Sequence, residues 1–179
     1  LVALLGTGSI DAKEEAVGAL TRLAHNNPPN QLAIASGLVG LLGAGTAEAQ
    51  EQVTQMLIKF AQHPDNRMAI AESGAIARLV IQVRGLGDSS LKAQKLAAEA
   101  LSNLAGDSQA NVESIAENGG VKPLVALLVS ESAEAQARAA SALAFMSRKS
   151  MEIQTAVCKE GAIEYLTNLL QPVEKLPTG

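Results

Sequence analysis

The sequence predicts an all-α protein in which similar helical units stack into a solenoid. The first observation is a thirteen-residue phrase that occurs four times, beginning at Ala12, Ala49, Ala93 and Ala135. The second is a leucine inside that phrase, which recurs at intervals of 37, 44 and 42 residues as Leu20, Leu57, Leu101 and Leu143. The third is composition, with 47% hydrophobic but only 2% aromatic residues, so that strong helix formers dominate. A helical period of about 40 residues is typical of solenoids, whose units bury apolar faces only against neighbouring units.

The last complete copy shows most clearly how one unit is built. Ser132 precedes a long helix expected over 133–148, in which small or apolar residues recur at Ala135, Ala139, Ala142, Leu143 and Met146. A short helix over 152–159 should turn inward the side chains of Ile153, Ala156 and Val157. A third helix over 162–170 should bury Ile163, Leu166, Leu169 and Leu170. Between these two helices a glycine allows a tight reversal, and we expect such turns at Gly37, Gly74, Gly119 and Gly161.

Composition and charge favour some classes of protein over others. The net charge of −4 argues against non-specific nucleic-acid binding, which requires a basic surface. No apolar run is long enough to insert into a membrane. A single cysteine, Cys158, fits a reducing compartment, so we expect the cytoplasm, with the nucleus as an open alternative.

The sequence offers little support for an enzyme, a metal site or a cofactor. Cys158 aligns with alanines of the other units, which predicts a small, buried core position. His25 and His63 are expected to close two long helices, where an imidazolium complements the helix dipole. The remaining candidates are carboxylates on helix surfaces that we expect to be solvated, namely Glu14, Glu15, Glu48, Glu51 and Glu99.

One segment carries a resemblance to a known family. The string ESIAENGGVKPLVALLVSESAEAQARAASALAFMS over 113–147 resembles the armadillo repeat, with its apolar first helix, Gly-Gly turn, proline-led second helix and alanine-rich third helix. SNLA over 102–105 is similar to the end of the family's third helix. The HEAT repeat, with two helices per unit, is the alternative. The resemblance implies a right-handed α-α superhelix formed by a single array over 1–179, divided at about 1–37, 38–74, 75–119 and 120–161, with a partial repeat and tail over 162–179.

Three places depart from the repeated pattern. The connection after Gly37 is about three residues shorter than the one after Gly119, and the segment 84–90 is about three residues longer than its counterpart. Both changes fall at connections, where length costs little. At the start, Leu1, Val2, Leu4 and Leu5 look like the second helix of a unit that begins upstream. We expect them to be partly exposed or covered by another chain, which leaves end-to-end self-association open.

The resemblance also implies a ligand-binding surface on the long helices. In the family these helices line the concave side, and ligand-facing residues lie three and four positions apart. Carried onto this chain, the predicted peptide-binding residues are Arg22, Gln55, Lys59, Glu99, Asn103, Arg138, Ser141 and Phe145. The family's backbone-gripping asparagine persists only as Asn103, and Arg22 and Lys59 stand where other members carry it.

The predicted function is therefore a non-enzymatic scaffold that binds an extended or helical segment of a partner protein. Losing the asparagine and tryptophan ladder of importin-α-like members disfavours a nuclear-import adaptor. Arg22 and Lys59 favour a partner with acidic residues, as in β-catenin-like members. The substrate-binding arm of a larger ubiquitin ligase is a further alternative.

Overall fold

The computed structural model describes residues 10–43, 47–85, 90–106 and 108–170, and within these ranges every regular element is a helix. Four long helices recur along the chain: α2 (Ile10–Ala24), α4 (Ala47–Ala61), α7 (Leu91–Ala105) and α10 (Ala133–Lys149). One or two further helices follow each of them, and all of these except α3 (Pro28–Gly43), which has 16 residues, are shorter. The shorter ones are α5 (Pro64–Glu72) and α6 (Ala75–Val83), α8 (Gln109–Glu117) and α9 (Val121–Ala126) with the 3-10 turn η1 (Leu127–Val129), and α11 (Met151–Lys159) and α12 (Ala162–Leu169).

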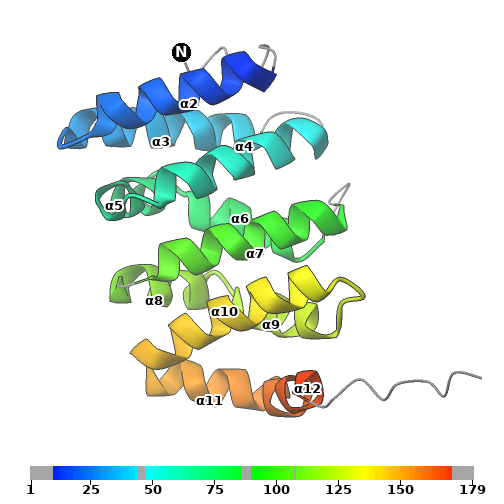
Figure 1. Cartoon of the computed structure of the whole chain (residues 1–179). Helices are drawn as coiled ribbons and strands as arrows, with labels where there is room; N and C mark the ends of the chain where they lie inside the picture. Colours follow the sequence, from blue (N-terminus) through cyan, green and yellow to red (C-terminus); the bar gives the residue numbers. More distant parts are fainter. Residues whose placement is uncertain (1–9, 44–46, 86–89, 107, 171–179) are drawn as a thin grey trace, which may run out of the picture.

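The helices form two rows, so that the predicted solenoid is confirmed. The long helices lie side by side in the order α2, α4, α7, α10, and the helices that follow them form the second row behind them (Figure 1). We call the surface formed by the four long helices the long-helix face. The repeated leucines lie between the rows with exposed fractions of 5%, 1%, 0% and 2%, in the order Leu20, Leu57, Leu101 and Leu143. Burial against neighbouring layers therefore holds the stack together.

Serine residues occupy the N-caps of several helices in the later units. Ser90, Ser108, Ser132 and Ser150 each occupy the N-cap of a helix and accept a hydrogen bond from the backbone N–H three residues on. Such caps satisfy one of the N–H groups that a helix start leaves without a partner. The predicted cap at Ser132 is thus confirmed.

Side-chain amides close the ends of the long helices. In every layer an asparagine or glutamine near the start of the following helix donates to a carbonyl at the end of the long helix. The donors are Gln31 to Ala24 at 3.0 Å, Asn66 to Phe60 at 3.0 Å, Asn111 to Leu104 at 2.9 Å and Gln154 to Ser147 at 2.8 Å. These carbonyls have no partner within the helix itself. The amides therefore connect the end of each long helix to the start of the helix that follows it.

The turn glycines follow the prediction at three of four positions. Gly74, Gly119 and Gly161 have φ of 83°, 72° and 84°, a left-handed conformation that side chains disfavour. Gly37 is the exception, because it lies inside the continuous helix α3. The connection there is about three residues shorter than at Gly119 and leaves no residues for a reversal. The short and medium helices of that unit are consequently joined into one.

The last helix is much more exposed than its sequence pattern predicted. Ile163, Leu169 and Leu170 are 61%, 40% and 84% exposed, and Leu166 is half-buried. The equivalent helix α6 is covered by the next long helix, α7, whereas α12 packs mainly on α11 and η1. In the described part of the chain no further long helix covers α12, so its apolar pattern remains open.

Two further predictions concern single positions. Cys158 was expected in the core but its side chain is exposed. Helix α11 turns Ile153 and Val157 inward, and the residue next to Val157 points to the other side. Leu1, Val2, Leu4 and Leu5 lie outside the described residues, so the predictions about the start of the chain stay predictions.

Glu51 is not simply solvated, as the sequence had suggested. Its carboxylate lies 2.8 Å from the Lys92 ammonium and accepts a hydrogen bond from the Ser90 hydroxyl, the same group that caps α7. Hydrogen bonds from Lys92 and Ser90 lower the pKa of Glu51 below its ordinary value. The pair connects α4 to the start of α7.

The lowered pKa predicts a pH-dependent contribution to stability. A carboxyl group with a lower pKa in the folded state stabilises the fold above its ordinary pKa, and this contribution disappears as pH falls through the folded value. We expect Glu51→Gln to be less stable than the unchanged chain at pH 7, and the two to converge at acid pH. Urea unfolding followed by circular dichroism between pH 7 and pH 3 measures this. A constant difference over that range would contradict the prediction.

Candidate functional site

The predicted peptide-binding residues all lie on the four long helices. Arg22, Gln55 and Lys59 are exposed, on α2 and α4. Asn103 and Glu99 on α7 are half-buried, as are the three residues predicted on α10, Arg138, Ser141 and Phe145. Phe145 packs partly against the core, so only part of its ring reaches the surface. The long-helix face therefore consists of an open half, α2 and α4, and a more closed half, α7 and α10.

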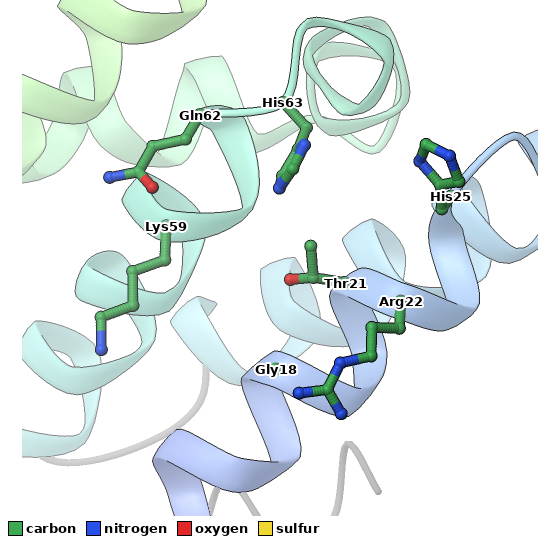
Figure 2. Close-up of a pocket in the computed structure, with 7 residues that line it drawn as sticks. All are labelled: Gly18, Thr21, Arg22, His25, Lys59, Gln62 and His63. Atoms are coloured by element: carbon green, nitrogen blue, oxygen red, sulfur yellow. The ribbon is translucent and has the colours of Figure 1, made fainter.

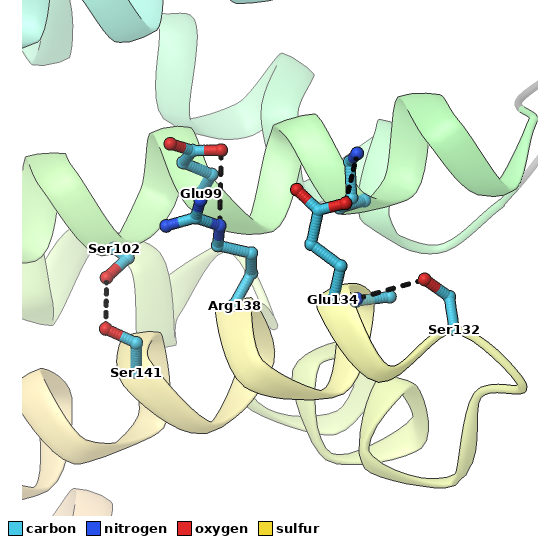
Figure 3. Close-up of polar contacts among 8 residues, drawn as sticks. Glu99, Ser102, Ser132, Glu134, Arg138 and Ser141 are labelled. Atoms are coloured by element: carbon cyan, nitrogen blue, oxygen red, sulfur yellow. Dashed lines mark hydrogen bonds and ion pairs between the residues drawn. The ribbon is translucent and has the colours of Figure 1, made fainter.

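Paired polar side chains join α7 to α10. Lys95 Nζ lies 2.9 Å from Glu134 Oε2, Arg138 Nε lies 3.3 Å from Glu99 Oε2, and the hydroxyls of Ser102 and Ser141 are 3.1 Å apart. Figure 3 shows the last two pairs spanning the gap between the helices. Three residues predicted to face a ligand are thus paired with side chains of the protein itself. The two ion pairs are partly accessible to water and contribute only about 0–1 kcal/mol each, but they reduce the net charge that this half presents.

The open half contains a hollow between the ends of α2 and α4, which we call the basic hollow. Its volume is about 520 Å³, and the residues that line it are Gly18, Thr21, Arg22, His25, Lys59, Gln62 and His63. None of these described residues carries a carboxylate. Figure 2 shows Arg22 and Lys59 extending from facing helices, with the two imidazoles nearer the end at which both helices finish.

The two histidines occupy different local positions. His25 directly follows α2, as predicted, and its Nε2 lies 3.3 Å from the amide nitrogen of Asn26. Asn26 has a φ of 52°, a left-handed conformation that asparagine tolerates better than most residues. His63 was expected to close α4, but it is the extended N-cap residue of α5, directly before Pro64. A proline at the first helical position suits a helix start, and this placement turns His63 toward the hollow.

The described residues contain no group of three or more His, Cys, Asp or Glu side chains suited to hold a metal ion. Among the helices that are described, none is long and apolar enough to cross a membrane.

The pairing across α7 and α10 was the main feature missed from the sequence. Each partner lies 39 residues after the first member, as in Lys95 with Glu134 and Glu99 with Arg138. Opposite charges at one constant offset between adjacent repeats are a signal that could have revealed the pairs. A second missed feature was the placement of both histidines around one hollow, which depends on how far α2 and α4 have shifted along each other.

The stacked helical units define this chain as an α-solenoid of the kind that presents one long-helix face. Residues 63–106 and 108–144 match the family described as Armadillo/beta-catenin-like repeat. An engineered protein of known structure is 31% identical, with a TM-score of 0.78, over 97% of this chain and 71% of that one. The chain belongs to the armadillo-repeat family.

Two other solved structures are similar. A second engineered protein is 27% identical with a TM-score of 0.75, covering 94% of this chain and 71% of that chain. A designed armadillo repeat protein in complex with the peptide (KR)4 is 24% identical with a TM-score of 0.77, over 97% of this chain and 74% of that chain. No curated protein matches the chain.

Proposed function

We propose that this chain is a non-enzymatic protein-interaction scaffold whose long-helix face binds an extended segment of a partner. The observation that carries the proposal is the basic hollow, which adjoins a row of polar side chains on stacked helices. Neighbouring helices are about 8–10 Å apart, and an extended chain advances about 3.3 Å per residue. Each layer then spans about three residues of a ligand, and the four layers about a dozen.

The side chains on this face have complementary roles in the proposal. Asn103 can donate to and accept from a peptide backbone, which gives affinity for many sequences. Arg22 and Lys59 add a preference for acidic residues, mainly through association rate and specificity because both are exposed. Gln55 adds a neutral polar contact, and the accessible edge of Phe145 an apolar one. Glu99, Arg138 and Ser141 are half-buried, whereas Arg22, Gln55 and Lys59 are exposed. We therefore place the centre of binding on α2 and α4.

The alternatives fit less well. A nuclear-import adaptor would need a ladder of tryptophans and asparagines, and this sequence contains no tryptophan. The designed armadillo protein with the basic peptide (KR)4 supports only the idea that such a fold accommodates a peptide. The arm of a ubiquitin ligase remains compatible, since it would bind its substrate in the same way. The proposed compartment is the cytoplasm, with the nucleus as alternative, and a fluorescent fusion of the full-length protein would test it.

The proposal predicts how a charged probe peptide binds. We expect a fluorescein-labelled dodecapeptide of alternating glutamate and alanine to bind more tightly than one of alternating lysine and alanine, with affinity that falls as salt rises. Replacing both Arg22 and Lys59 by alanine should weaken the acidic probe about two- to thirtyfold, since exposed charge pairs contribute about 0.2–1 kcal/mol each. Asn103→Ala should weaken both probes alike. Fluorescence anisotropy measures all of these affinities.

The matched control removes two exposed cations from the other row of helices, Arg78 on α6 and Lys122 on α9. It lowers the net charge equally and should leave binding within about twofold, because distant exposed charges are screened at physiological salt. If the control weakens the acidic probe as much as the Arg22 and Lys59 variant does, the long-helix face is not the binding surface.

A further inference from the structure

We propose that the basic hollow binds a phosphoserine or phosphothreonine of the partner peptide. This inference rests on the proposed function and deepens it by naming the residue that the hollow recognises. The starting observation is the concentration of donors there. Two cationic side chains and two imidazoles surround one space, in a chain that contains two histidines in all.

The lining suits a phosphate group better than a carboxylate. A phosphomonoester carries about −1.5 to −2 charges at neutral pH and three strong acceptor oxygens. Arg22 offers the planar fork of donors that binds phosphate through two hydrogen bonds, and Lys59 lines the same hollow from the neighbouring helix α4 (Figure 2). The N–H groups of His25 and His63 and the amide of Gln62 supply further donors. Glu15, the nearest acidic residue before them on α2, does not line the hollow.

Helix ends would ordinarily oppose an anion at this place, because exposed carbonyls give a helix C-terminus partial negative charge. Here the terminal carbonyls already accept hydrogen bonds. Ala24 O accepts from Gln31, Phe60 O from Asn66, and Ala61 O from the Arg67 guanidinium at 2.9 Å. The amide caps therefore reduce the repulsion that an incoming phosphate would meet, and Arg67 brings a further positive charge to the end of α4.

Two further hollows lie beside the basic hollow. Thr21, His25 and His63 also line a small one of about 20 Å³, which reaches Gln31 and Asp65 and has room for about one water molecule. A third hollow, of about 560 Å³, is lined by Asn26, Pro28, Gln31, Pro64, Asp65 and Met68. The basic hollow and the third hollow share no lining residue, so a ligand that occupies both runs along the outer surface between them.

The third hollow has a different chemistry. Met68 is 67% exposed, and Pro28 and Pro64 are exposed beside it, which offers an apolar surface. Asp65 lines both the small hollow and the third one and repels an anion there, so a phosphate is restricted to the basic hollow with Arg22 and Lys59. A peptide that places its phosphoresidue in the basic hollow should therefore place an apolar side chain against the third hollow, a few residues away.

Binding of two degenerate peptide libraries tests the inference. Each library consists of eleven-residue peptides with one fixed central residue. That residue is phosphoserine in one library and serine in the other. We expect the phosphoserine library to bind about tenfold more tightly, because charge-assisted, bidentate hydrogen bonds are the strongest class available. Replacing Arg22 and Lys59 by alanine should bring the two libraries within about twofold of each other, whereas the Arg78 and Lys122 control keeps the preference. Sequencing the bound fraction should show enrichment of apolar residues on one side of the phosphoserine, which Met68→Glu removes.

The two histidines give a direct readout of the location. Both line the hollow, so the imidazole ¹H–¹³C resonances of the chain report on this site. We expect both to shift on addition of the phosphoserine library and to move little with the serine library or with inorganic phosphate at equal concentration.

The possible failures are distinguishable. Equal affinity for the two libraries, with loss of both on Asn103→Ala, would overturn the phosphate site and leave the scaffold proposal intact. No binding of either library would overturn both. Histidine shifts that inorganic phosphate reproduces would mean a simple anion site, and binding of phosphoinositide vesicles without binding of peptides would mean a membrane site. Each of these last two outcomes overturns the inference.

Discussion

Replacing Leu101 by alanine is expected to lower the free energy of unfolding by about 2–5 kcal/mol, the range for removing a large buried side chain. Leu101 is 0% exposed and lies on α7, which packs against α4, α6 and α10. The cavity would therefore open where two layers meet, and neighbouring helices cannot close it without separating from other contacts. Urea unfolding followed by circular dichroism at 222 nm measures the change.

A leucine on the same helix provides the matched control. Leu91 is 45% exposed at the start of α7, so Leu91→Ala makes the same chemical change with little loss of burial. We expect it to cost less than about 1 kcal/mol, as surface changes usually do. Similar costs for the two variants would contradict the stacking of α7 between its neighbours. Because stacked repeats can unfold in parts, the transition should also be followed by a second probe.

The helices and their stacking were predictable because they depend on patterns within one repeat. The spacing of Ala135, Ala139 and Leu143 places them on one side of a helix whatever lies around it. The exposure of Ile163 and Leu170 could not be predicted in the same way. Whether an apolar residue is buried depends on the helix that covers it, and the sequence pattern of α12 is the same with or without that cover. Gly37 shows a similar limit. Because the connection after it is short, it lies inside a helix and does not form the turn that its pattern predicted.

The candidate surface was predictable as a set of residues but not as a set of contacts. The resemblance to the armadillo family placed Arg22, Lys59 and Asn103 on the long helices, where the structure has them. It could not show that Glu99 pairs with Arg138, because that contact depends on the register between two helices. The resemblance also could not predict that His63 and His25 line the same hollow, because His63 lies at the start of α5 and not at the end of α4. Contacts between layers therefore decide which side chains of the face are paired with one another.

The second large loss of stability is expected on replacing Asn111, one of the side-chain amides that donate to a carbonyl at the end of a long helix. Its side chain is 4% exposed and donates to Leu104 O at 2.9 Å, where α7 ends. Asn111→Ala removes the donor and leaves a buried carbonyl without that partner, which costs about 1–3 kcal/mol. Substitution by leucine should cost a similar amount, because an apolar side chain of comparable size fills the space but cannot satisfy the carbonyl.

The equivalent amide hydrogen bond at the end of α10 provides the control for Asn111. Gln154 donates to Ser147 O at 2.8 Å, but its side chain is exposed. Water can replace its hydrogen bond, so Gln154→Ala should cost less than about 0.5 kcal/mol, in the usual range for surface changes. Urea unfolding of the two variants gives the comparison, and hydrogen exchange at the Gly106 amide, which bonds to Ser102 O, reports on the last turn of α7. We expect faster exchange there in Asn111→Ala alone. Equal losses of unfolding free energy in the two variants would mean that the amide hydrogen bonds do not set the angle of the turn between rows. Apolar packing would then set it.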